Sequence, residues 1–269
     1  MGECNGSLTK EHVISKSVLP GLMRFKVAEN TYIPTGSATV RLLCEYHNNI
    51  VISELDKEAS KYFNTYAAMQ RVPSLTQKWT PDDPKSVTID GNKLERWFAK
   101  TFINMLAAKI GIVDDGREVD FALQNGFREY VFGKSNKPLE YPYGLWTALP
   151  HGKFMNHTAI VAHIHTNPFR IYRKNLSTWT DEKRNPQYLM FQPGGTSHIH
   201  IFMLNLSYIE NQNISDEDIY KMFSMNKENG LQHRPARIGF SVYSKGETEK
   251  PESNEPDNII TFDWGNPHG

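Results

Sequence analysis

Two short stretches near the start of the chain contain residues that can do chemistry together. "LTKEHVISKSVL" (residues 8–19) places Glu11 directly before His12, and "LLCEYHNNIVISELDKEA" (residues 42–59) contains Asn48. A carboxylate oxygen and an amide oxygen are hard ligands that suit Mg²⁺ or a similar divalent ion. A neutral histidine beside such an ion can take a proton from water. If the stretches pair as an antiparallel hairpin with a helix packed across it, they predict hydrolysis of a phosphodiester in a nucleic-acid backbone.

The elements that must position these residues are two strands and a helix. Residues 8–12 and 39–44 have the composition of strands, and the second breaks at polar residues from Glu45. The residues that follow have apolar side chains at helical spacing, namely Leu55, Ala59, Tyr62 and Phe63. Ser53 and Asp56 are spaced as a capping box, so the sequence predicts that this helix begins at Ser53.

These two stretches resemble the motifs of the HNH endonucleases, a family with a ββα-metal fold. The first is similar to the family's acid–histidine motif and the second to its Cys-x-x-[Cys/His]-Asn strand-to-helix motif. The resemblance implies that His12 is the general base and that Glu11 and Asn48 bind a catalytic Mg²⁺ or Mn²⁺. It also implies a DNA substrate, nicked by one site or cut in pairs by a homodimer, and it fits a role in bacterial or phage defence.

The same resemblance implies two supporting features. Many members of the family brace the loop after the histidine with an asparagine, and the corresponding position here is Thr39, whose hydroxyl can also form hydrogen bonds. Members also often hold the hairpin with zinc, for which Cys4, Cys44 and His47 are the candidate ligands. Three candidates are one short of the four ligands of a closed structural site, so the sequence favours a hairpin without zinc.

Basic residues indicate where a nucleic acid would bind. The chain has 30 Lys+Arg and 30 Asp+Glu, so binding must come from local patches and not from overall charge. One patch is expected in the loop that follows the histidine, and a second is interleaved with aromatic residues that can stack on bases. The candidates are Lys16, Arg24 and Lys26 in the first patch and Arg170, Arg173 and Lys174 in the second. A solvated strand edge explains the second patch equally well.

The chain divides by pattern into three units, which predict an α+β fold. Residues 1–75 form the HNH module, 76–140 a helical bridge, and 141–269 a β-rich C-terminal domain with an acidic mobile segment near 245–258. The bridge contains the strongest helical pattern, whose apolar stripe is typical of a core-facing helix: Leu94, Trp97, Phe98, Phe102, Met105, Leu106 and Ile110. A second helix is expected to end near Gly133. Strand patterns fall at 157–165, 169–173, 188–192 and 197–209.

Two alternatives remain open. His163 and His165, like His198 and His200, are each expected on one face of a strand, where they can bind a transition metal or serve a two-histidine phosphoesterase. A non-catalytic protein that binds nucleic acid or another ligand through a degenerate zinc-knuckle-like hairpin is the other alternative.

Composition limits the remaining classes. Two cysteines in 269 residues exclude a disulfide framework, and 39% hydrophobic residues are typical of a globular protein. The sequence contains no run of eighteen apolar residues and no charged-then-apolar leader. It therefore predicts a cytoplasmic protein that does not contact a membrane.

Overall fold

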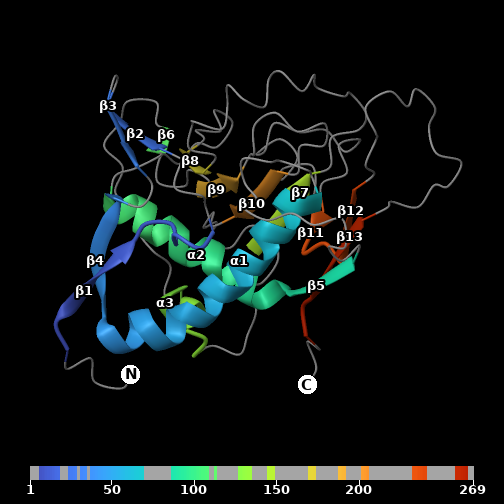
Figure 1. Cartoon of the computed structure of the whole chain (residues 1–269), viewed down its shortest axis with the longest axis horizontal. Coiled ribbons are helices and arrows are strands. Elements are labelled where there is room, and N and C mark those ends of the chain that lie inside the picture. The colour runs from blue at the N-terminus through green and yellow to red at the C-terminus, as the bar shows by residue number, and fades with distance from the viewer. Residues whose placement is uncertain are drawn as a thin grey trace, which may run out of the picture.

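The structure is a computed structural model (Figure 1). It describes residues 6–18, 24–28, 31–34, 37–69, 86–108, 112–113, 127–134, 144–148, 169–173, 187–191, 201–205, 232–240 and 258–265. Over these residues the chain combines helices with strands, as the α+β prediction requires. No helix in these described ranges has the length and apolar character needed to cross a membrane.

The two predicted strands of the N-terminal module pair with each other. Strand β1 (Leu8–His12) is antiparallel to β4 (Thr39–Cys44), and His12 lies opposite Thr39. The register shifts between Thr9 and Glu11, where β4 contains one residue more than β1. Such a bulge changes the direction in which nearby side chains point, and bulges are frequent beside active sites. A separate hairpin, β2 (Arg24–Ala28) with β3 (Thr31–Pro34), lies between β1 and β4 in the sequence.

A helical segment follows β4 at once. It starts as a π-helical turn, η2 (His47–Val51), and continues as α1 (Ile52–Met69). The predicted capping box is wrong, because the chain is already helical before Ser53. The Ser53 hydroxyl donates to the Ile50 carbonyl oxygen at 3.0 Å, and the Asp56 carboxylate accepts from side chains outside the helix.

Helix α2 (Gly91–Ala108) is the centre of the hydrophobic core. Its predicted stripe is buried at the five positions whose side chains are described: Leu94, Trp97, Phe98, Phe102 and Met105. It packs against α1, with the rings of Phe63 and Trp97 5.4 Å apart. The apolar periodicity of the sequence therefore predicted correctly which face of this helix is buried.

A six-stranded sheet lies beside α2 (Figure 1). The strand order is β11-β7-β10-β9-β8-β6, antiparallel throughout except for the parallel pair β6–β8. The strand bounds are Ile112–Val113 (β6), Gly144–Ala148 (β7), Phe169–Arg173 (β8), Gln187–Phe191 (β9), Ile201–Asn205 (β10) and Gln232–His233 (β11). Three of the four strand patterns read from the sequence coincide with β8, β9 and β10, and the fourth, 157–165, lies outside the described residues.

A three-stranded sheet connects the middle of the chain to its end. It has the order β12-β13-β5, with bounds Arg237–Phe240 (β12), Asn258–Asp263 (β13) and Ser86–Asp90 (β5). Strand β5 belongs to the predicted bridge, yet it pairs in parallel with β13, with Ile89 opposite Phe262. Both side chains join the core cluster that also contains Ile14. The described parts of the three predicted units therefore share one core.

A buried ion pair fixes the first half of α2 to this part of the fold. Glu95 is 0% exposed, and its carboxylate accepts two hydrogen bonds from Arg234, from Nε at 3.0 Å and from Nη2 at 2.8 Å. It also accepts from the Tyr130 hydroxyl on α3 (Phe127–Val131) and from the Leu145 backbone at 2.8 Å. A side chain on Gly144 would approach the Glu95 Oε2 atom to 2.6 Å, so glycine is required there. The α3 helix ends close to Gly133, as predicted, and Gly133 has φ +67°.

This cluster predicts a loss of stability at high pH. Burial, and then the neighbouring Glu95 carboxylate, raise the pKa of Tyr130 well above its ordinary value of 10.0. Below pH 10 the tyrosine is protonated in both the folded and the unfolded chain. At higher pH only the unfolded chain releases this proton, so stability falls as pH rises.

The Tyr130 contribution approaches about 1.4 kcal/mol per pH unit. Urea unfolding at pH 9, 10 and 11 gives the pH dependence of the free energy of unfolding for the wild type and for Tyr130→Phe. The difference between the two slopes is the Tyr130 contribution, because the two proteins share all their other ionisable groups. Equal slopes for the two proteins above pH 10 would contradict the prediction.

Candidate functional site

The site forms where β1 meets the π-helical turn on one side and α2 on the other. Asn48 is the second residue of this turn, and its Nδ2 atom donates to the Thr9 hydroxyl at 3.1 Å and to the Lys10 carbonyl oxygen at 3.4 Å. The second contact falls at the bulge, directly before Glu11. The two motifs of the sequence are therefore joined through Asn48, as the hairpin-and-helix hypothesis requires.

The Glu11 carboxylate points away from solvent and towards α2. It is 4% exposed, and its Oε1 atom accepts from Lys100 Nζ at 2.5 Å and from Asn104 Nδ2 at 3.1 Å. Within the part of the chain that the structure describes, the Oε2 atom of Glu11 is buried and has no hydrogen-bond partner. An unpaired buried carboxylate oxygen is unfavourable, so this atom is a position at which a cation or a donor would be stabilised.

The Lys100 ammonium lies between two carboxylates. Besides Glu11 it contacts Asp56 Oδ1 at 3.3 Å, and Asp56 also accepts from Trp97 Nε1 at 3.0 Å and from the Ser15 hydroxyl. Lys100 is 3% exposed, so the cluster has little screening by water. Two carboxylates and one ammonium give a net formal charge of −1, which favours the addition of a cation.

His12 is half-buried at the end of β1, beside Glu11. Its backbone carbonyl oxygen accepts from Asn104 Nδ2 at 3.4 Å, and the following amide of Val13 donates to the Ala38 carbonyl oxygen at 2.9 Å. Thr39 lies directly across the strand pair, which is the neighbourhood that its predicted bracing role needs. The backbone of the acid–histidine pair is thus held on both sides.

Glu11 and Asn48 each offer an oxygen of the kind that a divalent ion takes. The unpartnered Oε2 of Glu11 supplies a carboxylate oxygen. Since the Nδ2 atom of Asn48 is committed to β1, its Oδ1 atom is the one that remains for a cation. The structure brings both residues to β1, but their hydrogen bonds go to different partners, and none joins one to the other. The described parts of the chain contain no cluster of three or more His, Cys, Asp or Glu side chains placed to hold a metal.

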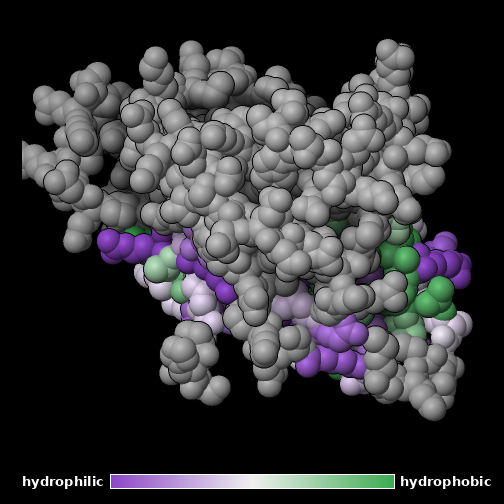
Figure 2. Space-filling view, turned by 180° about the vertical axis from the view of Figure 1, so that it is seen from behind, coloured by the Kyte–Doolittle hydropathy of each residue, from purple (hydrophilic) through white to green (hydrophobic). Residues whose placement is uncertain are grey.

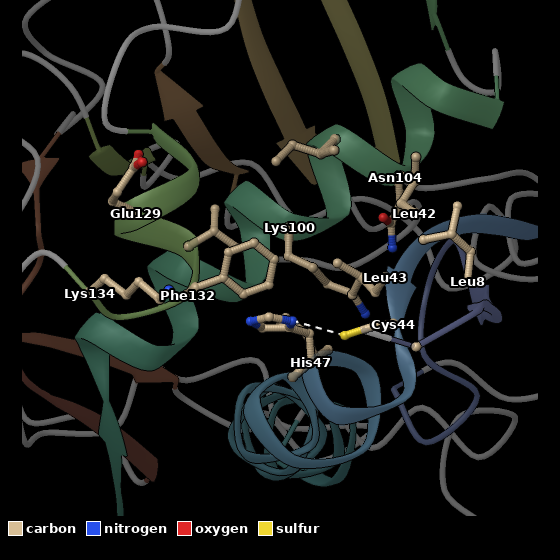
Figure 3. Close-up of a pocket in the computed structure, with 14 residues that line it drawn as sticks. Leu8, Leu42, Leu43, Cys44, His47, Lys100, Asn104, Glu129, Phe132 and Lys134 are labelled. Atoms are coloured by element: carbon tan, nitrogen blue, oxygen red, sulfur yellow. Dashed lines mark hydrogen bonds between the residues drawn. The ribbon is translucent and has the colours of Figure 1, made fainter. Parts of the chain in front are cut away.

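Two of the three candidate zinc ligands come together. The Cys44 Sγ and His47 Nδ1 atoms are 3.1 Å apart, and the His47 ring packs against Phe132 with centroids 4.9 Å apart (Figure 3). Cysteine and histidine are the ligands that structural zinc prefers. The third candidate, Cys4, lies outside the described residues, so the expectation of a hairpin without zinc is not tested.

A pocket of about 400 Å³ opens beside these residues. Its walls are mainly apolar side chains from β1, β4, α2 and α3, and Lys100 and Asn104 extend into it from α2 (Figure 3). Leu8 and Leu42 also line it and are 52% and 39% exposed. Seen from behind, hydrophobic and hydrophilic surface lie side by side at the edge that carries β1 and β4 (Figure 2).

The predicted phosphate-binding residues are scattered over several elements. Lys16 is exposed in the turn after His12, and α1 holds this turn through the Ser60 hydroxyl, which donates to the Ser17 carbonyl oxygen at 2.8 Å. Arg24 and Lys26 are on β2, and Arg170 and Arg173 are on β8. Lys174 and the histidines of both His-x-His pairs lie outside the described residues, so their predicted roles are untested.

Sequence reasoning missed the support that α2 gives to the site. Lys100 and Asn104 follow Trp97 at helical spacing and lie on the buried side of an otherwise apolar stripe. A lysine and an asparagine at core positions of an amphipathic helix are unusual and need partners. That pattern indicates a buried polar contact, but it does not identify Glu11 as the partner. Comparisons of the chain with protein-family models, with curated proteins and with solved structures each found no match.

Proposed function

We propose that the module built from β1, β4 and α1 is a metal-dependent endonuclease site that hydrolyses phosphodiester bonds of DNA. The observation that carries the proposal is the contact of Asn48 with β1, because it brings two motifs far apart in the sequence to one place. The buried, unpartnered Oε2 of Glu11 supports the assignment of this carboxylate as a ligand.

Each residue has a distinct role in the proposed reaction. Glu11 and Asn48 would hold Mg²⁺ or Mn²⁺, which when bound polarises the phosphate and stabilises the charge of the leaving oxygen. His12 accepts a proton from the attacking water. The water oxygen forms a new bond to phosphorus as one phosphorus–oxygen ester bond breaks. Lys16, exposed in the turn after His12, contacts a neighbouring phosphate as a point charge.

A plasmid assay tests the proposal. Supercoiled DNA incubated with the full chain is expected to become nicked in Mg²⁺ or Mn²⁺ and to stay intact in EDTA. A protein that is folded by circular dichroism, yet leaves the plasmid intact in every metal, would contradict the proposed activity.

One observation favours a second candidate, a non-catalytic nucleic-acid-binding module. The buried Lys100 ammonium already neutralises Glu11, which is how a structural ion pair is arranged. This candidate predicts that the protein shifts the mobility of a DNA duplex equally in Mg²⁺ and in EDTA, without any cleavage. Cleavage that depends on the metal would exclude it.

A further inference from the structure

We propose that Lys100 and Asn104 of α2 are positioning residues for the metal-binding carboxylate, so that the site extends beyond the ββα module into the core helix. This inference rests on the proposed function, since it concerns how Glu11 presents itself to the divalent ion. It assigns a role to two residues that lie about 90 positions after Glu11 in the chain.

The two side chains contact the acid–histidine pair from one face of α2. They are four residues apart and therefore lie one above the other on the helix. Lys100 reaches Glu11 Oε1 at 2.5 Å, while the Asn104 amide reaches both Glu11 Oε1 at 3.1 Å and the His12 carbonyl oxygen at 3.4 Å. One amide thus contacts the proposed ligand and the backbone of the proposed base.

The distribution of these donors separates positioning from simple charge neutralisation. Both donors use the same oxygen, Oε1, and leave Oε2 buried without a partner. An ion pair with only a structural role is expected to satisfy both oxygens, because an orphaned buried acceptor is unfavourable. Holding one oxygen fixes the rotation of the carboxylate, and the other oxygen then keeps a constant direction. Hydrogen bonds that orient ligating groups in this way are general in metal sites.

Lys100 is itself anchored. Its contact with Asp56 at 3.3 Å connects it to α1, the helix that follows Asn48. The proposed ligands therefore approach from β1 and from the segment leading into α1, and Lys100 lies between these elements. A displacement of α2 would move the Glu11 carboxylate relative to Asn48.

The test compares two asparagines of the same helix. Asn104→Leu removes the hydrogen-bonding atoms of the amide and keeps the branching and the number of side-chain heavy atoms. Asn92→Leu is the matched control, because the Asn92 Nδ2 atom donates to the Trp264 carbonyl oxygen at 2.6 Å, away from the site. Calorimetric titration with Mn²⁺ gives the dissociation constant, and plasmid nicking gives the Mn²⁺ concentration for half-maximal rate. Asn104→Ala is measured in parallel, so that misfolding of the leucine variant does not decide the result.

We expect both Asn104 variants to raise the Mn²⁺ dissociation constant and the half-maximal concentration by about 10–100-fold. Their nicking rate should recover at saturating Mn²⁺, and Asn92→Leu should bind Mn²⁺ as the wild type does. Asn104 variants that bind Mn²⁺ like Asn92→Leu, beside a wild type that nicks DNA, would overturn the positioning role alone. A folded wild type that neither binds Mn²⁺ nor nicks DNA would overturn the proposed function and this inference together.

Discussion

Replacing His12 with alanine is expected to slow metal-dependent nicking by roughly 10²–10⁴-fold, the usual contribution of a positioned general base. The backbone at this position is held by the Asn104 amide and by pairing with the strand that contains Thr39. Removing a half-buried imidazole should therefore change the chemistry far more than the fold. Initial nicking rates at saturating Mn²⁺ measure the effect.

Two comparisons make this result specific. Added imidazole should restore part of the activity of His12→Ala, because a free base can enter the space that the side chain leaves. Lys57→Ala, an exposed change on α1 of the same module, should nick at the wild-type rate. A His12→Ala protein with wild-type activity would exclude the proposed base. If that activity were instead lost in His198→Ala, the C-terminal two-histidine phosphoesterase would be the better explanation.

Replacing Glu95 with alanine is expected to lower the free energy of unfolding by about 3–5 kcal/mol, the cost of leaving one member of a buried ion pair without its partner. Glu95 is fully buried, and Arg234, 17% exposed, loses both of its hydrogen bonds to the carboxylate. The Tyr130 hydroxyl and the Leu145 amide also lose their acceptor. This cluster holds the helix that carries Lys100 and Asn104.

Urea unfolding, followed by circular dichroism, measures this loss. Glu54→Ala removes an exposed carboxylate whose ion pair lies in solvent, so it should change stability by less than about 1 kcal/mol. The double variant Glu95→Met with Arg234→Met should recover much of the lost stability, because it leaves no unpaired buried charge. A Glu95→Ala protein as stable as Glu54→Ala would show that the pair is not coupled to the core.

The helices and strands near the site were predictable because their patterns are local. The apolar period of α2 identified Trp97 and Phe98 as core residues, and both are fully buried. The predicted start of α1 at Ser53 lies one residue after its first residue, Ile52. The predicted cap is wrong, because a π-helical turn precedes α1 and Asp56 accepts from the Lys100 and Trp97 side chains. A capping box is a local pattern, whereas the partner of Asp56 is set by packing.

The candidate site was predictable only in part. The sequence predicted Glu11 and Asn48 on neighbouring elements. Glu11 lies on β1, and the Asn48 side chain donates a hydrogen bond to this strand. It could not reveal that Lys100 and Asn104 would contact Glu11, since that contact depends on how α2 packs across the strand pair. The assembly of the three-stranded sheet was equally hidden, because β5 and β13 are distant in sequence and carry no turn signal that connects them.

The pairing of β5 with β13 has a consequence for the order of events during synthesis. Helix α2 follows β5 directly, and the core around it includes Ile260 and Phe262 of β13. The ribosome must therefore have passed residue 263 before this core can close, however early Glu11 and His12 emerge. A nascent chain that already exposes Glu11 and His12 lacks the completed support for Lys100 and Asn104. The core that supports these two side chains is therefore completed only after β13 has been synthesised.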